Sequence, residues 1–424
     1  MLTLLLCVFV GLLLVGVPIG FAMLGASLLV IGLEGIPISV AAQRVATSVQ
    51  SFPLLAVPLF TLAGALMNES GISERLFNFT RAFVGHIRGG LAQTAIVGNV
   101  FLSGISGSSV ADCAATSRVF VPQLTQAGYG RGFAAAVCAA AATLGPIIPP
   151  SILMVIYAWQ ANVSLGDLFI AGLIPGVVMA VAMMLVVGIT AHKRGFPKDA
   201  AFSVDNLWNA FRQALWALAM PILILVGFRI GVFTATEIAG VACAYSLFVG
   251  LFVYRTLSWK GLPAILLSTG RETAAILVIA AGAAPFGWIL GVEQAPQQVA
   301  ALLTSVSTEP WIILLILNIA LLIAGMFMET LAIMIILVPI LIPLLNELQI
   351  NLVHFGIVLL VNLVIGQITP PVGVLMFVAS SVSKTHLGLI VKEIGPFIVA
   401  LVAALMLMTY LPQLSLWLPQ YLKH

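Results

Sequence analysis

Long apolar stretches recur along the whole chain and constrain its fold more than any other feature. The first of them, residues 2–33, contains no charged side chain. A helix needs roughly 20 mostly apolar residues to cross the hydrocarbon core of a membrane. Only 7% of the 424 residues are charged, whereas a soluble domain has about 25%. The chain therefore has too few charges to cover a water-exposed surface. We predict an all-α polytopic membrane protein rather than a soluble enzyme, a nucleic-acid-binding protein or a disordered chain.

Polar, charged and Gly/Pro-rich breaks divide the apolar stretches into nine predicted full spans. The first is too long for the apolar core of a signal peptide and is predicted to be one tilted span. Two further stretches, 90–126 and 311–345, have a polar or Gly-rich centre. Each is predicted to form a re-entrant hairpin of two short helices that enters and leaves on the same side. The nine spans are residues 2–33, 53–70, 132–160, 168–190, 214–233, 236–254, 273–291, 353–383 and 388–411.

The positively charged side chains predict the orientation. With the N-terminus in the cytoplasm, the predicted crossings place 14 of the 17 Lys and Arg residues on the cytoplasmic side. The other three, Arg44, Arg229 and Lys423, lie outside, and Arg44 is a mild misfit because it follows the first span. Positive residues concentrate in cytoplasmic loops. We therefore predict a cytoplasmic N-terminus and an external C-terminal tail at 412–424.

Glycine and proline patterns occur twice in the chain at an offset of 221 residues, the difference between positions 145 and 366. One unpaired span between the two halves would invert the second half relative to the first. The charges agree with inversion, because no Lys or Arg occurs between Arg271 and Lys384. The matched positions are Gly145–Pro150 with Gly366–Pro371, Gly104 with Gly325, Pro122 with Pro343, and Pro175 with Pro396.

We therefore predict three parts and a tail. The first inverted repeat, 1–190, contains a scaffold helix, the hairpin 90–126 and a broken helix at 132–160. A loop and a connecting span occupy 191–235. The second repeat, 236–411, contains the hairpin 311–345 and a broken helix at 353–383. Inverted repeats with discontinuous helices are typical of secondary transporters, whose site lies near the membrane midplane. The chain has no Walker motif, so we do not expect it to hydrolyse ATP.

Four breaks at predicted membrane depth are candidate binding sites, because non-helical backbone there lines a cavity or lies buried in protein. Two are the hairpin tips, at 103–112 and 325–330, and two are the Pro-Pro segments, at 143–151 and 362–372. A proline pair removes two amide donors and leaves carbonyl oxygens unpaired, which suits a hard monovalent cation such as Na⁺. Helix N-termini suit an anionic substrate. Together these features predict a coupled cation and carboxylate site.

Plainer interpretations stay open for these segments. Gly/Ser-rich stretches in membrane helices also serve close helix packing. Acidic residues at membrane depth are functional by default, yet Asp112 and Glu329 could each cap a half-helix or pair with an arginine such as Arg118. The four cysteines lie in apolar runs without metal-ligand spacing and are predicted to be small core residues; they are Cys7, Cys113, Cys138 and Cys243.

Several motifs together resemble those of one transporter family, the large membrane subunit of the tripartite ATP-independent periplasmic (TRAP) transporters. The segment Gly104–Thr116 contains Gly-Ile-Ser-Gly-Ser-Ser-Val-Ala-Asp, and Gly145–Pro150 follows it. Phe228–Gly240 contains Gly-Val-Phe-Thr-Ala-Thr-Glu, and Asn362–Gly373 contains Ile-Thr-Pro-Pro-Val-Gly. The likeness covers nearly the whole chain, and the joint occurrence of these motifs in this order is highly specific.

The resemblance implies a Na⁺-driven importer of organic acids, such as C4-dicarboxylates, sialic acid or sugar acids, in the bacterial inner membrane. It implies two partners, a periplasmic substrate-binding protein and a separate small membrane subunit, with Na⁺ as the coupling ion and no other cofactor. It also implies an elevator mechanism. The scaffold would include 2–33, 214–233 and 236–254. The moving part would hold 53–191 and 273–411, without the arm-like segments 34–50 and 255–271.

The resemblance further implies Na⁺ sites where each hairpin tip meets a broken helix, with the substrate between the two tips. The residues expected to bind Na⁺ are Ser103, Gly104, Asp112, Thr143, Gly145, Pro149, Gly325, Gly366, Thr369 and Pro370. The residues expected to bind the substrate are Ser106, Gly107, Ser108, Ser109, Pro150, Met328, Glu329, Thr330 and Pro371.

Two other functions are weighed against this one. A stand-alone ion-coupled anion transporter of the elevator class would work without a binding protein. An intramembrane enzyme would need a paired nucleophile and base within the bilayer, and the chain offers no Ser/His or His-cluster spacing for one. We therefore do not expect an enzyme.

Overall fold

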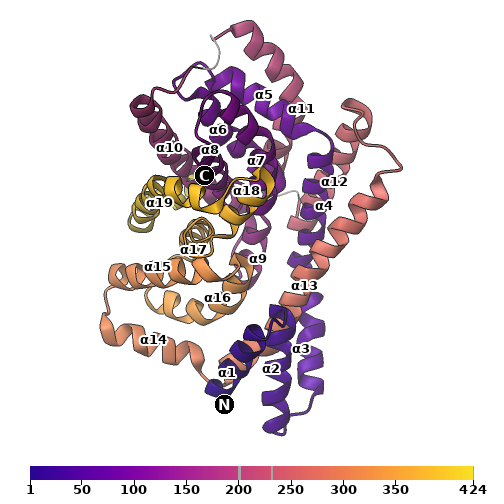
Figure 1. Ribbon diagram of the computed structural model, residues 1–424. Coiled ribbons are helices and arrows are strands. Elements are labelled where there is room, and N and C mark those ends of the chain that lie inside the picture. Colours follow the sequence, from indigo (N-terminus) through magenta and orange to yellow (C-terminus); the bar gives the residue numbers. More distant parts are fainter. Residues whose placement is uncertain (199–201, 231–232, 424) are drawn as a thin grey trace.

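The computed structural model describes residues 1–198, 202–230 and 233–423, and in this part every extended regular element is a helix (Figure 1). Seven of the described helices are long and apolar enough to cross a membrane. The predicted class, an all-α polytopic membrane protein, agrees with this architecture. The helices of the first half are α1 (Leu2–Leu14), α2 (Ile19–Leu33), α3 (Ser39–Val49), η1 (Phe52–Leu55), α4 (Ala56–Glu69), α5 (Ile72–Val84), α6 (Gly90–Ser106), α7 (Ser109–Gln126), α8 (Arg131–Ala141), η2 (Ala142–Leu144), α9 (Ile152–Ala161) and α10 (Leu165–Arg194).

The second half repeats the alternation of long and broken helices. Its elements are α11 (Val204–Ile230), α12 (Ala235–Phe248), η3 (Val249–Val253), α13 (Leu262–Val292), α14 (Ala295–Val306), α15 (Pro310–Phe327), α16 (Thr330–Glu347), α17 (Leu352–Gly366), α18 (Val374–Ser383), α19 (Leu387–Tyr410) and α20 (Gln413–Lys423). The predicted tail, 412–424, is therefore mostly helical, and its residue 424 lies outside the described residues.

The predicted single span at 2–33 is wrong, because the chain turns between α1 and α2. Gly16 adopts a positive φ of 91°, which favours glycine, and Pro18 lacks the amide needed to continue a helix. The two helices then fold back on each other. A Cβ atom added to Gly25 of α2 would lie only 3.4 Å from the Leu12 side chain of α1, so the helices pack closely there. Apolar content alone did not reveal this turn.

The predicted division of 255–291 into an arm and a separate span is also wrong. Helix α13 runs without interruption through 31 residues from Leu262 to Val292. The charged pair Arg271 and Glu272 does not end this helix, because both side chains are exposed. One of the four cysteines, Cys7, is exposed as well, whereas Cys113, Cys138 and Cys243 are buried as expected.

Both predicted hairpins consist of two helices joined by a very short break. Helices α6 and α7 are separated only by Gly107 and Ser108, and α15 and α16 only by Met328 and Glu329. Both predicted broken helices are interrupted at their Pro-Pro segments, between η2 and α9 and between α17 and α18. The entry of each hairpin from a single membrane face stays a prediction.

The helices form two groups that lie side by side in Figure 1. The slab, which we define as α1–α4, α12 and α13, runs along the lower and right side of the view. Within it α13 packs on α2, α3 and α4, and α4 packs on α12. The bundle, which we define as α6–α10 and α15–α20, contains both hairpins and both broken helices. Within it α8 packs on α19, α7 on α18, and α15 on α17.

Candidate functional site

The first hairpin tip is built around the fully buried carboxylate of Asp112. Gly107 ends α6 with a φ of 60°, a conformation that favours glycine, and Ser108 then caps α7 by accepting a hydrogen bond from the Ala111 amide. This sharp reversal brings the end of α6 next to the first turn of α7. As a result the Ser103 hydroxyl donates to Oδ2 of Asp112 at 3.1 Å, and the Ser106 hydroxyl donates to Oδ1.

Asp112 is neither a helix cap nor part of an ion pair in the described residues. The capping position belongs to Ser108, four residues earlier, and the ion pairs described for the chain do not include Asp112 or Arg118. A buried carboxylate is costly unless hydrogen bonds or a cation compensate for its lost hydration. The two serine hydroxyls supply part of that compensation, and a bound cation would supply more.

The first Pro-Pro segment packs directly on this tip. A Cβ atom at Gly145 would lie 2.9 Å from Oδ2 of Asp112 and 2.9 Å from the Ser109 amide nitrogen. A Cβ atom at Gly107 would lie 2.6 Å from the carbonyl oxygen of Pro150. These distances leave no room for a side chain at either glycine, so backbone approaches backbone. Carbonyl, hydroxyl and carboxylate oxygens therefore gather in one small region.

The structure thus brings together most of the residues expected at the first tip. Thr143 is buried nearby, but its hydroxyl donates to the Ala140 carbonyl of the preceding turn at 2.7 Å. A Cβ atom at Gly104 would lie 3.4 Å from the Pro149 carbonyl oxygen. The residues that gather here are Ser103, Gly104, Ser106, Gly107, Ser108, Ser109, Asp112, Gly145, Pro149 and Pro150.

The second tip meets the second Pro-Pro segment through two glycines. A Cβ atom at Gly366 would lie 2.6 Å from the carbonyl carbon of Gly325. Thr369 donates its hydroxyl to the Ile365 carbonyl at 2.7 Å. Glu329 precedes α16 at the capping position, but its side chain makes no capping bond and is exposed, so it is not the counterpart of the buried carboxylate at the first tip. The capping interpretation therefore fails for Glu329 too.

Gln367 joins the two tips and was not among the residues expected to bind substrate or Na⁺. Its Oε1 accepts a hydrogen bond from the Ser109 hydroxyl at 2.8 Å, and its Nε2 donates to the Thr330 hydroxyl at 2.8 Å. The only signal in the sequence is a difference between the repeats, since the matched position in the first half is Pro146. That difference did not indicate a contact.

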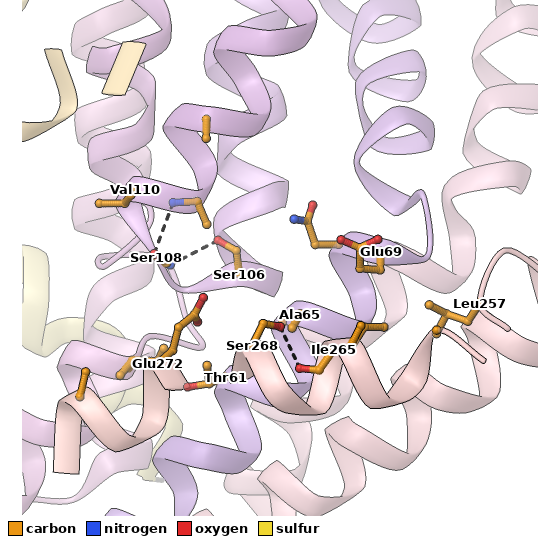
Figure 2. A pocket seen from close by; sticks show the side chains of 18 of the residues that line it. Thr61, Ala65, Glu69, Ser106, Ser108, Val110, Leu257, Ile265, Ser268 and Glu272 are labelled. Atoms are coloured by element: carbon orange, nitrogen blue, oxygen red, sulfur yellow. Dashed lines mark hydrogen bonds between the residues drawn. The ribbon is translucent and has the colours of Figure 1, made fainter. Parts of the chain in front are cut away.

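A cavity of about 1010 Å³ opens beside the first tip (Figure 2). Ser106 and Ser108 face it from the tip, and the Ser108 amide donates to the Ser106 hydroxyl at 3.3 Å. The opposite wall comes from α4 and α13 and carries Glu69 and Glu272. The described lining includes no Lys or Arg and no residue of the second tip. Pockets for small organic molecules have about this size, and this one reaches only the first hairpin.

The oxygen-rich region at Asp112 suits a hard monovalent cation. Its donors are hydroxyl, carbonyl and carboxylate oxygens rather than nitrogen or sulfur, and Zn²⁺ or copper would prefer the latter. Among the described residues, no group of three or more His, Cys, Asp or Glu side chains could hold a metal ion. The oxygen donors at Asp112 therefore favour a hard cation over Zn²⁺ or copper.

Comparison with known proteins identifies the family to which the chain belongs. The model of the family described as "Tripartite ATP-independent periplasmic transporter, DctM component" matches residues 6–414. The chain belongs to this transporter family. The resemblance inferred from the motifs is thereby confirmed, as is the expectation that the chain is not an enzyme, because its relatives are transporter permeases.

Two relatives are similar over most of their length. The chain is 42% identical to the C4-dicarboxylate TRAP transporter large permease of Pseudomonas aeruginosa over 373 residues, which are 88% of this chain and 87% of that protein. It is 38% identical to the sialic acid TRAP transporter large permease of Vibrio cholerae over 411 residues, which are 97% and 96% of the two chains.

A solved structure shares the fold at low sequence identity. The YdaH transporter of Alcanivorax borkumensis aligns with a TM-score of 0.61 at 16% identity, covering 85% of each chain. At that identity the likeness concerns the fold alone. It places the helical architecture described above among known transporter folds.

Proposed function

We propose that this chain is the large membrane subunit of a Na⁺-driven, binding-protein-dependent importer of organic acids. The observation that carries the proposal is the buried Asp112 carboxylate, which two serine hydroxyls and the first Pro-Pro segment surround. Acidic side chains at membrane depth mark ion pathways. In a transporter without an ATP-binding motif, an ion gradient is the available energy source.

The first Na⁺ site lies at Ser103, Gly104 and Asp112, with Thr143, Gly145 and Pro149 opposite. The second lies where Gly325 meets Gly366, Thr369 and Pro370. Packing of each hairpin tip on a broken helix supports both sites. The first has a full negative charge and the second has only neutral oxygens, so we expect Na⁺ to bind more tightly at the first.

The substrate binds between the two tips. One side consists of Ser106–Ser109 and Pro150, and the other of Met328–Thr330 and Pro371. The names of the two relatives, which carry a C4-dicarboxylate and a sialic acid, support a carboxylate substrate. The cavity wall carries Glu69 and Glu272, which repel an anion. Binding of Na⁺ at Asp112 would offset this repulsion, and this is a physical reason for coupling.

Transport proceeds by an elevator movement of the bundle along the slab. The described contacts between them are apolar and lack direction, as in the ring pair Phe60–Phe169, which joins α4 to α10. At Gly64 of α4 the two backbones come close, since a Cβ atom there would lie 3.2 Å from the Ile105 carbonyl oxygen. Two surfaces that meet through such non-directional contacts can slide past each other at a low cost in free energy. Because α4 packs on α12 and α13, and α13 packs on α2, we assign α4 and α13 to the scaffold, although the family scheme put 53–70 and 273–291 in the moving part.

The two repeats, 1–190 and 236–411, are inverted, and both hairpins are re-entrant. The chain lies in the bacterial inner membrane, with the Arg-rich segment that follows α4 in the cytoplasm and the C-terminus in the periplasm. Because α1 and α2 fold back on each other, the predicted cytoplasmic N-terminus no longer follows from the number of crossings. Arg75, Arg81 and Arg88 follow α4 directly, so in this orientation Glu69 lies at the cytoplasmic end of α4 and the cavity opens to the cytoplasm. A separate small membrane subunit and a periplasmic binding protein complete the transporter. The description of both relatives as large permeases supports a separate small partner.

Uptake by proteoliposomes tests the proposal. The chain would be reconstituted with the small subunit and the binding protein encoded beside it, using labelled succinate and N-acetylneuraminate as probes. Uptake should require both an inward Na⁺ gradient and the binding protein. Equal uptake in choline would refute Na⁺ coupling. Na⁺-dependent uptake without the binding protein would favour the stand-alone transporter instead.

A further inference from the structure

The amide of Gln367 is the described side chain that touches both hairpin tips. It is 95% buried in the second Pro-Pro segment, with 5% of its surface exposed. We propose that Gln367 is a positioning residue that couples the two tips, so that Na⁺ binding at the first tip raises the Na⁺ affinity of the second. This inference rests on the proposed Na⁺-coupled function.

The position of the two hydroxyls makes the amide sensitive to movement of either hairpin. Ser109 is the first residue of α7, and Thr330 is the first residue of α16. Each lies 2.8 Å from one end of the same amide. A buried amide that loses a partner pays the full desolvation cost of the freed group. The arrangement with both bonds made is therefore favoured over one in which a single tip has moved away.

The first cation site is directly connected to this amide. Gly145 packs closely on the first tip, since a Cβ atom added to it would lie 2.9 Å from both Oδ2 of Asp112 and the Ser109 amide nitrogen. A cation that draws the Asp112 carboxylate, the tip and the Pro-Pro segment together also fixes Ser109. Fixing Ser109 orients the Gln367 amide, which in turn holds Thr330.

Among the described residues a single side chain makes this link, and the link is unsymmetrical. Position 146, which matches 367 in the first repeat, is a proline and has no side-chain hydrogen-bonding group. The cavity reaches Ser108 at the first tip but none of the described residues of the second tip. Gln367 is therefore placed to carry the state of the tip at the cavity to the other tip. Coupling of two sites requires such an element whose arrangements differ in free energy.

Replacing Gln367 by Leu keeps its approximate volume and removes both hydrogen bonds. Uptake in the reconstituted complex would be measured as a function of external Na⁺, with choline maintaining the ionic strength. We expect the Hill coefficient for Na⁺ to fall towards one. We expect the Na⁺ concentration at half-saturation to rise by about fivefold or more, the lower end of typical coupling between sites.

Gln160→Leu is the matched control. Gln160 also donates from a partly buried amide, to the Ile335 carbonyl at 3.0 Å, and so joins α9 to α16 within the bundle without touching either tip. We expect this variant to lower the thermal stability of the full chain and to leave the Hill coefficient unchanged. A fall in the Hill coefficient for Gln160→Leu as large as for Gln367→Leu would contradict a specific role for Gln367.

A second pair of variants keeps the test decisive if Gln367→Leu does not fold. Ser109→Ala and Thr330→Val each remove one bond, and together they form a double-mutant cycle. We expect their effects on half-saturation by Na⁺ to be non-additive, because the same amide connects them. Additive effects, or a wild-type Hill coefficient of one, would overturn the coupling. A wild type that transports without Na⁺ would overturn the proposed function itself.

Discussion

Asp112→Asn is the sharpest test of the first cation site. The substitution removes the charge and keeps the size of a side chain that is fully buried. A cation held between the tip and the first Pro-Pro segment would lie about 5 Å or less from the carboxylate. At an effective dielectric constant of about 20, unit charges at that distance attract by about 3 kcal/mol. Loss of this attraction corresponds to a loss of about 100-fold in Na⁺ affinity.

The cost to folding should be much smaller than the cost to Na⁺ binding. The asparagine oxygen still accepts a bond from one of the two serine hydroxyls, Ser103 or Ser106. The asparagine amino group can donate to the other, since a hydroxyl also accepts. Exchange of one buried hydrogen bond for another changes stability by about 1 kcal/mol. The substitution should therefore weaken the Na⁺ dependence of uptake while changing the yield of folded protein only slightly.

The assay measures uptake against external Na⁺ in proteoliposomes and thermal stability of the purified chain in NaCl against choline chloride. Asp112→Asn should raise the half-saturating Na⁺ concentration by at least tenfold and weaken stabilisation by Na⁺, because only the second proposed Na⁺ site is left intact. Glu237→Gln is the control. That carboxylate is exposed and accepts bonds from Thr234 in a capping box at the start of α12, within the slab. A half-saturation for Asp112→Asn within twofold of the wild type would refute the cation role.

Further predictions concern the tips and the orientation. Gly145→Ala should abolish uptake, because the added methyl group would lie 2.9 Å from a carboxylate oxygen at the first tip. Gly240→Ala is the control and should leave uptake unchanged, because a methyl group there meets nothing within 4 Å. Glu329→Gln should change half-saturation by Na⁺ by less than about threefold, since this side chain is exposed and belongs to neither proposed Na⁺ site. A loss as large as that expected at the first tip would contradict this. In a cysteine-free background, Gln297→Cys should react with a membrane-impermeant maleimide added from the periplasmic side and Lys198→Cys should not. Both side chains are exposed, so the reverse labelling would overturn the orientation.

The positions of the breaks were predictable from the sequence, because their causes are local. The first hairpin divides at Gly107 and the second at Met328, both inside the predicted segments. The Pro-Pro segments interrupt their helices because proline has no amide hydrogen to donate. In a membrane each unpaired peptide group is costly. The residues that break a helix therefore stand out wherever they occur.

The wrong predictions concern segments whose hydropathy is compatible with two different structures. Residues 2–33 contain enough apolar side chains for one long span, yet they form two helices that fold back at Gly16. The charged pair Arg271 and Glu272 was predicted to separate an arm from a span, yet both residues lie within the continuous helix α13. The Glu272 side chain projects into the cavity, where water can reach it. Hydropathy measures how apolar a stretch is and does not show where the chain turns or which face meets a cavity.

By itself, the sequence determined the membrane class, the family, the two hairpins and the Pro-Pro breaks, because hydrocarbon imposes the same demand on every peptide group along the chain. Only the tertiary structure decided that Asp112 lies between two serines and that Glu329 is exposed. It also decided that one amide joins both tips. Gln367 is 258 residues from Ser109 and 37 from Thr330. A contact between such distant positions depends on how the helices pack, and no local pattern encodes it.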